Sequence, residues 1–220
     1  MIRSLLSLTA VAVLLSACAQ APLRGTGDLG VVVERATGSL QIIESDTRTA
    51  LARVEGLGDL SHASVVFSRD QRYAYVFGRD GGLSKVDLLT ARIDRRIIQG
   101  GNSIGGAISQ DGKLIAVSNY EPGGVKVFDA LTLEHVADIP ATPLPDGQKR
   151  SRVVGLVDAP GQRFVFSLFD TGEIWTADFS QGHTPRIERF TAIGQQPYDA
   201  LITPDAVSYT HLTLPTKRIV

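Results

Sequence analysis

Short stretches of alternating apolar and polar residues, rich in Val, Ile, Phe and Tyr, follow one another from Leu29 onward. Turns of Gly, Asp, Asn and Ser separate them, and no apolar period of 3.6 residues lasts long enough for a helix. The pattern therefore predicts an all-β chain. A glycine followed by an alternating stretch and an acidic residue recurs at intervals of about 42 to 48 residues. The four copies are residues 38–44, 82–87, 124–129 and 172–178.

A repeat of this length, with about four strands in each unit, is typical of β-propeller blades. We expect four blades and the start of a fifth unit at Gly194. Asp87 and Asp129 each follow a third strand, where a carboxylate can accept backbone N–H bonds in an Asx-turn, so we interpret both as structural rather than catalytic acids. The expected blades cover residues 29–54, 63–98, 107–139 and 153–190.

The amino terminus has a different pattern. Arg3 precedes an apolar run of about ten residues, too short to cross a bilayer, and Leu-Ser-Ala-Cys follows it. We interpret residues 1–17 as a lipoprotein signal peptide, because Leu-Ser-Ala-Cys resembles the bacterial lipobox; the alternative is that Cys18, the only cysteine, is there by chance. Lipid on Cys18 would anchor the protein to the membrane, because each buried methylene of an acyl chain adds about 0.8 kcal/mol to the free energy of membrane binding.

The residues after Cys18 refine this prediction. By resemblance to Gram-negative lipoproteins, Ala19 in place of Asp indicates the outer membrane, with the body of the protein in the periplasm. Residues 18–27 are expected to form a lipid-anchored tether, and residues 28–205 a partial propeller.

Composition excludes some classes of partner and reaction. The chain has 220 residues, 43% hydrophobic content and a net charge of −1, so no nucleic-acid partner is expected. It has no Cys/His cluster, no Gly-x-Ser-x-Gly motif and no pair of carboxylates on a helix, which leaves a hydrolase unsupported. We interpret the glycine-rich run 100–106 as a connection between blades, because a strand follows it where a dinucleotide site needs a helix.

The repeat predicts where a site would lie. The first strand of a blade lies nearest the propeller axis, and the connection leading into it opens on one end of the central channel. Counting back eight residues from the turn acids Asp70 and Asp111 gives His62 and Ser103, and the corresponding position of the fourth blade is Arg152. In the fifth unit that position is occupied by Pro197. We expect His62, Ser103 and Arg152 to point around one rim.

Two of these residues have a possible chemical role. A lone histidine is more often a polar residue with satisfied hydrogen bonds, but an imidazole on an axis-facing loop also suits an axial ligand of haem iron. Arg152 and its neighbour Arg150 could bind carboxylates of a modified tetrapyrrole bidentately, or could be solvated loop charges. The residues alone leave both alternatives open.

The segment 62–82, H-A-S-V-V-F-S-R-D-Q-R-Y-A-Y-V-F-G-R-D-G-G, resembles the haem d1 domain of the cytochrome cd1 nitrite reductase family, an eight-bladed propeller. Residues 119–125 and 150–154 align with further parts of that domain. The resemblance implies that this chain forms about the first four blades. It also implies that His62 is the proximal iron ligand and that Tyr120 and Arg152 face the cofactor, haem d1 or its iron tetrapyrrole precursor.

The reductase and a dehydrogenase relative carry an amino-terminal cytochrome c domain with a Cys-x-x-Cys-His motif, which this chain lacks. It resembles instead the periplasmic, often lipid-anchored members required for haem d1 biosynthesis. The resemblance thus implies binding of a haem d1 precursor and a part in its late, oxidative maturation for the nitrite reductase of denitrification. Whether the protein is a tetrapyrrole dehydrogenase or only binds and transfers the tetrapyrrole stays open. Other haem d1 biosynthesis proteins and cytochrome cd1 nitrite reductase are the expected partners.

The sequence departs from the family pattern in one respect. The reductase has an arginine shortly after its ligand histidine and another in the following connection, whereas residues 64–66 and 101–106 here are uncharged, so carboxylate recognition should differ.

An alternative function is that of an envelope lipoprotein propeller that serves as a protein-interaction scaffold. It predicts no tetrapyrrole binding and no special role for His62.

Residues 206–220, A-V-S-Y-T-H-L-T-L-P-T-K-R-I-V, break the repeat. They resemble translated sequencing-adapter tails, so we interpret them as a non-native tail of a truncated fragment, and the alternative is a divergent strand.

Overall fold

The computed structural model describes residues 28–202 and 209–212, and the ordered elements in these ranges are β-strands. The first two sheets contain β1 (Leu29–Glu34), β2 (Ser39–Glu44), β3 (Thr49–Val54), and then β4 (Ser64–Phe67), β5 (Tyr73–Phe77), β6 (Gly82–Asp87) and β7 (Arg92–Ile98). The third contains β8 (Asn102–Ile108), β9 (Leu114–Glu121), β10 (Gly124–Asp129) and β11 (His135–Pro140). The fourth contains β12 (Val153–Ala159), β13 (Arg163–Leu168), β14 (Glu173–Asp178) and β15 (Arg186–Phe190), and β16 (Asp199–Ile202) pairs with β17 (Tyr209–Leu212).

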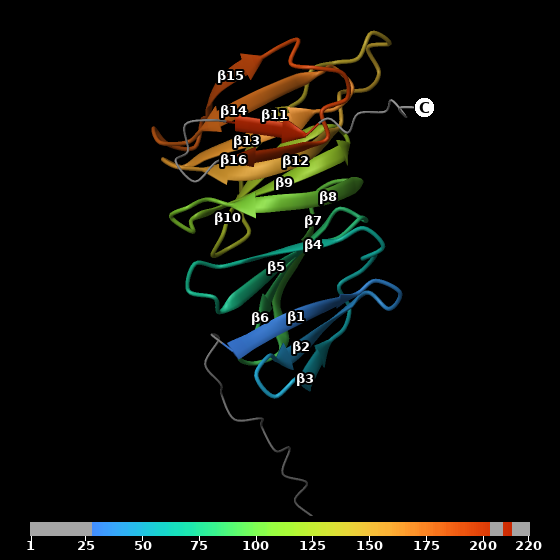
Figure 1. The fold of residues 1–220 in the computed structure, drawn as a ribbon, viewed down its shortest axis with the longest axis vertical. Helices are drawn as coiled ribbons and strands as arrows, with labels where there is room; N and C mark the ends of the chain where they lie inside the picture. Colours follow the sequence, from blue (N-terminus) through green and yellow to red (C-terminus); the bar gives the residue numbers. More distant parts are fainter. Residues whose placement is uncertain (1–27, 203–208, 213–220) are drawn as a thin grey trace, which may run out of the picture.

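The sheets have the architecture of propeller blades. Within each sheet the strands are antiparallel and follow the chain order, and the sheets succeed one another along the molecule from β1–β3 to β12–β15 (Figure 1). The first strands pack together, because β4 contacts β8, β8 contacts β12 and β12 contacts β16. The predicted all-β propeller is therefore confirmed.

The hydrophobic core lies between consecutive blades. One cluster joins blades one and two through residues such as Leu40 and Val76, and another joins blades two and three through Phe77 and Val117. The largest joins blades three and four and includes Trp175, which is 1% exposed. The blades therefore hold one another by burying the faces of their inner and middle strands.

The glycine-rich run 100–106 was expected to be a connection, and this prediction was wrong from residue 102 onward. Asn102 to Gly106 belong to the first strand of blade three, β8. A Cβ on Gly106 would come within 2.3 Å of the Ala116 oxygen and 2.4 Å of the Phe77 ring. Position 106 requires a glycine, because the Ala116 backbone and the Phe77 ring lie so close that any side chain would collide with them.

The acidic turns were predicted correctly. The Asp87 carboxylate accepts the N–H groups of Leu89 and Thr90 at 2.9 and 3.2 Å. Asp129 does the same for Leu131 and Thr132, at 2.9 and 2.8 Å. Both carboxylates are occupied in Asx-turns, which confirms their interpretation as structural residues.

Several predictions concern residues outside the described ranges, namely the signal peptide 1–17, Cys18 and the tether 18–27. Of the proposed non-native tail 206–220, the structure describes only 209–212, which form β17 in antiparallel register with β16, with Ile202 opposite Tyr209. Among the described residues, no helix is both long and apolar enough to span a bilayer.

Candidate functional site

The predicted rim exists as one end of the inner strands. In an antiparallel blade, the residues before the first strand lie beside those that end the second, so both contribute to the same end. The segments at this end belong to blades two to four and to the start of β16, and they carry His62, Arg79, Tyr120, Arg152, Phe169, Asp170 and Tyr198. Side-chain contacts join the last five of these.

The centre of this rim is an ion pair between Arg152 and Asp170. Arg152 donates from Nη2 to Asp170 Oδ1 at 2.6 Å and from Nε to Oδ2 at 3.0 Å. The backbone N–H of Arg152 donates to the same Oδ2 at 2.9 Å. These hydrogen bonds from Arg152 hold the pKa of the Asp170 carboxyl below its usual value.

Aromatic rings surround the guanidinium of this pair. Its carbon lies 4.5 Å from the centre of the Phe169 ring and 5.6 Å from that of Tyr120. Phe169 in turn meets the Tyr198 ring edge to face, with centroids 6.3 Å apart. The arrangement brings together two of the predicted site residues, Tyr120 and Arg152. The flat guanidinium of Arg152 lies over the rings of Tyr120 and Phe169, as in a cation–π interaction.

Charge connects this cluster with the neighbouring blade. Burial raises the pKa of the Tyr120 hydroxyl, the nearby Tyr198 acts in the same direction, and the charges of Arg152 and Arg79 oppose them. Arg79 also contributes to lowering the pKa of Asp59, whose main cause is a hydrogen bond from Ser61. The field of Arg79 therefore reaches both Tyr120 and the turn that precedes β4.

His62 lies in that turn. Asp59 shapes it by accepting the Ser61 N–H at 2.8 Å through its carboxylate and the Arg79 N–H at 2.8 Å through its carbonyl. The His62 side chain is exposed, and within the described residues its imidazole makes no hydrogen bond or ion pair. Its position at the entry to a first strand is the one that the repeat predicted, and its ring nitrogens are available to a ligand.

Two other sequence expectations are corrected. Ser103 does not point around the rim: it lies in β8, is 0% exposed and donates from Oγ to the Gly78 carbonyl at 2.7 Å, which ties blade three to blade two. Arg150 does not join the cluster around the Arg152 guanidinium, because its Nη1 donates to the Ala141 carbonyl at 2.7 Å. Arg150 lines a separate pocket of about 280 Å³ beside Pro122.

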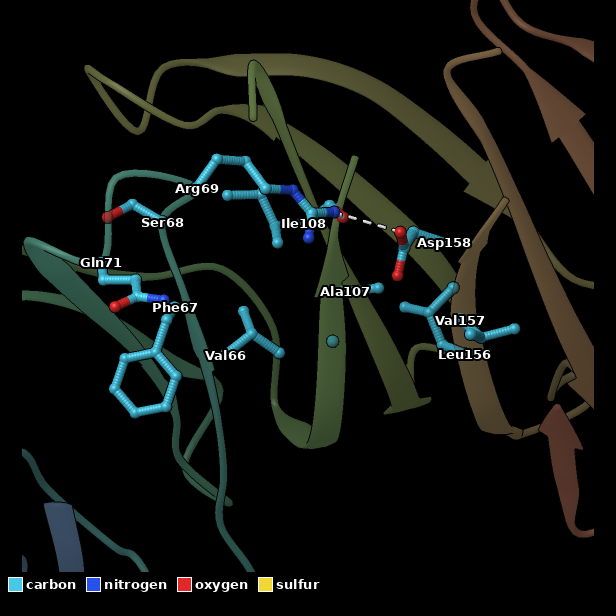
Figure 2. Close-up of a pocket in the computed structure, with 11 residues that line it drawn as sticks. Val66, Phe67, Ser68, Arg69, Gln71, Ala107, Ile108, Leu156, Val157 and Asp158 are labelled. Carbon is cyan, nitrogen blue, oxygen red and sulfur yellow. Dashed lines mark hydrogen bonds and ion pairs between the residues drawn. The ribbon is translucent and has the colours of Figure 1, made fainter. Parts of the chain in front are cut away.

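A larger pocket, of about 470 Å³, lies at the other end of the same inner strands (Figure 2). The last residues of β4, β8 and β12 line it, among them Phe67, Ile108 and Val157. Arg69 reaches across it from the turn after β4, donating to the Ile108 carbonyl at 2.8 Å and to Asp158 at 3.1 Å. This ion pair links blades two and four.

Sequence reasoning missed Asp170, Phe169 and Tyr198. The turn acids of the repeat indicate only the residues before each first strand, whereas Phe169 and Asp170 follow a second strand and Tyr120 lies near the end of one. In the fifth unit the count selected Pro197, which is buried, and its neighbour Tyr198 supplies the ring. No group of three or more potential metal-ligating side chains occurs within the ranges that the structure describes.

Comparison with known proteins agrees with the fold. Residues 24–213 match the family model for the Cytochrome D1 heme domain. The chain is 76% identical over 209 residues to protein NirF of Stutzerimonas stutzeri and 75% identical over 197 residues to protein NirF of Pseudomonas aeruginosa. These alignments cover 95% and 89% of this chain but 53% and 50% of the relatives. The chain thus spans about half the length of the curated relatives it matches.

A more distant relative is a named enzyme. The chain is 32% identical over 180 residues to the dihydro-heme d1 dehydrogenase of Pseudomonas aeruginosa, covering 81% of this chain and 36% of that protein. Among solved structures, dihydro-heme d1 dehydrogenase NirN in complex with DHE superposes with a TM-score of 0.74 at 28% identity. That match covers 84% of this chain and 39% of the solved one.

Proposed function

This chain belongs to the cytochrome d1 haem domain family, and from that premise we propose that it binds haem d1 or an iron tetrapyrrole precursor as part of haem d1 biosynthesis. The observation that carries the proposal is the rim itself. An exposed imidazole that none of the described residues engages and an aromatic cluster around a guanidinium lie at the same end of the inner strands.

The residues present fit such a group. His62 offers an exposed imidazole whose nitrogens are engaged by none of the described residues, as an axial ligand to iron requires. Tyr120, Phe169 and Tyr198 offer ring faces and edges to a flat macrocycle. Arg152 offers a charged N–H donor to an oxygen-bearing substituent of the macrocycle.

Each of these residues has a role in holding the ligand. His62 would hold the iron through one ring nitrogen, and Arg152 and Tyr120 would orient the macrocycle at the rim. The bound iron tetrapyrrole supplies the redox chemistry, and the protein supplies binding, orientation and the electrostatic surroundings. The proposed step is a late, oxidative one in maturation for cytochrome cd1 nitrite reductase, and the 32% identity to a dihydro-heme d1 dehydrogenase supports it.

We further propose that the protein works in the periplasm, held at the outer membrane by lipid on Cys18, in contact with other haem d1 biosynthesis proteins and with the reductase. The Leu-Ser-Ala-Cys motif supports this placement. The Cys18→Ala variant should move from the membrane fraction to the soluble periplasmic fraction, and an unchanged distribution would refute the anchor.

The proposed binding is tested by titrating the full chain with haem d1 and recording its absorption spectrum. We expect a saturable spectral change at one tetrapyrrole per chain. A spectrum that remains the sum of its components would instead favour the rival function, a propeller that serves as a protein-interaction scaffold.

A further inference from the structure

We infer that Asp170 is a positioning residue that determines how Arg152 contacts its ligand. The inference rests on the tetrapyrrole binding proposed above and concerns the chemical class of substituent that the rim accepts. Arginine usually binds a carboxylate with two parallel N–H bonds. In this protein Asp170 already occupies one of the two guanidinium faces that can make them, the side-on face of Nε and Nη2. The end-on face, formed by Nη1 and the second hydrogen of Nη2, is left for a ligand.

Asp170 is fixed independently of the arginine side chain. Its backbone N–H donates to Ser151 Oγ at 3.0 Å, and Ser151 is 0% exposed. Its carboxylate also accepts the backbone N–H of Arg152 at 2.9 Å. The neighbouring Phe169 N–H donates to the Arg152 carbonyl at 2.9 Å, so backbone bonds hold the two segments together. The carboxylate is therefore in place whether or not a ligand is present.

The aromatic rings limit the remaining freedom of the guanidinium. Phe169 and Tyr120 lie 4.5 and 5.6 Å from its carbon, so rotating the group away from Asp170 would lose a cation–π contact as well as two charged hydrogen bonds. Within the described part of the chain, Nη1 makes no hydrogen bond. Arg152 is 43% exposed at its side chain, so this nitrogen is open to a ligand.

Asp170 therefore leaves the end-on face of the guanidinium to a ligand and compensates the positive charge of Arg152. Because the open face carries little net charge, the rim suits a ring edge that presents a carboxylate or carbonyl oxygen, and it discriminates little between an ionised carboxylate and its ester. Without Asp170, the charge of Arg152 would be uncompensated, and the free acid would gain a preference.

The test compares zinc protoporphyrin IX with its dimethyl ester, using fluorescence to obtain dissociation constants for the full chain and its variants. For Asp170→Asn we expect binding of the free acid to tighten by about tenfold, because the uncompensated charge of Arg152 strengthens its hydrogen bonds to the ligand carboxylate, while binding of the ester stays unchanged. Asp170→Glu should retain the wild-type ratio of the two constants. Asp158→Asn, which breaks a similarly exposed Arg–Asp pair at the other end of the strands, should also retain it.

Equal changes for acid and ester in Asp170→Asn, or no change, would overturn the inference while leaving the proposed function standing. Failure of the wild-type chain to bind haem d1 in the titration described above would instead refute the proposed function, and with it the inference. Binding of haem d1 without binding of either zinc porphyrin would overturn the inference alone. A second readout needs no variant. In ¹⁵N spectra the Arg152 Nε–H signal should stay protected when the free acid binds; its loss would mean that the ligand displaces Asp170 and would overturn the inference as well.

Discussion

At the scale of single residues, the electrostatics of the rim are dominated by one pair. The hydrogen bonds from Arg152 lower the pKa of Asp170 from its ordinary 3.8. A carboxyl group with a lowered pKa in the folded state adds stability above its unfolded pKa, and this is lost as the pH falls through the folded value. The pair should therefore persist below pH 3.8, where isolated aspartates are already protonated.

The Arg152→Ala variant tests this coupling. Removing the guanidinium takes away the largest cause of the shift, so the pKa of Asp170 should rise toward 3.8. Carboxyl carbon resonances followed by NMR through an acid titration report this directly. Identical titration curves in the variant and the wild-type protein would show that Arg152 does not control the charge of Asp170.

The sequence located part of this chemistry and not the rest. Arg152 and His62 could be found because their places follow from the repeat period and the turn acids. Asp170 could not, because its role depends on two connections of blade four meeting in space, and nothing in the local sequence distinguishes it from Asp129 or Asp178, which accept backbone N–H groups in turns.

At the scale of elements, the blades are joined by close approach and by hydrogen bonds to turns. Gly106 lets β8 lie against the Phe77 ring of blade two. The Tyr75 hydroxyl donates to the Ala130 carbonyl at 2.7 Å, and the buried Lys85 ammonium donates to the Leu131 carbonyl at 2.8 Å. Two side chains of blade two thus hold the β10–β11 turn of blade three.

We expect Gly106→Ala to lower the free energy of unfolding by roughly 1–3 kcal/mol, because a methyl group would overlap the Ala116 oxygen and the Phe77 ring. Gly101→Ala is the matched control, since its nearest neighbour, the Glu121 Cβ, would be 3.8 Å from the new methyl group. Urea denaturation measures both. Equal stabilities of the two variants would contradict the close packing of β8.

The same glycines explain why strand β8 was predicted too short. Glycine is depleted in strands, and a run such as 100–106 normally marks a connection. Here the strand tolerates Gly105 and Gly106 because packing against blade two, rather than intrinsic propensity, determines the local structure. The period of the repeat was still sufficient to place all the other strands of blades two to four, because their apolar residues alternate and their turns carry Asp and Gly.

At the scale of the whole molecule, burial falls from the middle strands to the outer ones. Every residue of β6 is buried, whereas every residue of β15 except Ile187 is exposed. Amide protons should therefore exchange much more slowly in β6 and β13 than in β7 and β15. Hydrogen exchange followed by mass spectrometry measures this gradient, and uniform protection across the blades would contradict it.

The two ends of the inner strands carry different chemical groups. At one end, the ion pair of Arg69 and Asp158 joins blades two and four beside a pocket lined by residues of β4, β8 and β12. At the other, His62 and the cluster around Arg152 present an imidazole and aromatic faces to a ligand. The tetrapyrrole is accordingly expected at the His62 end.

The role of His62 as iron ligand is tested most directly by the absorption spectrum of the haem d1 complex of the His62→Ala variant. Loss of the axial imidazole should shift the absorption bands of the iron tetrapyrrole and weaken its binding, whereas His135→Ala, which alters an exposed histidine paired with Asp138, should leave the wild-type spectrum. If the His62→Ala complex has the same spectrum and affinity as the wild-type complex, His62 is not the iron ligand and the proposed site is wrong.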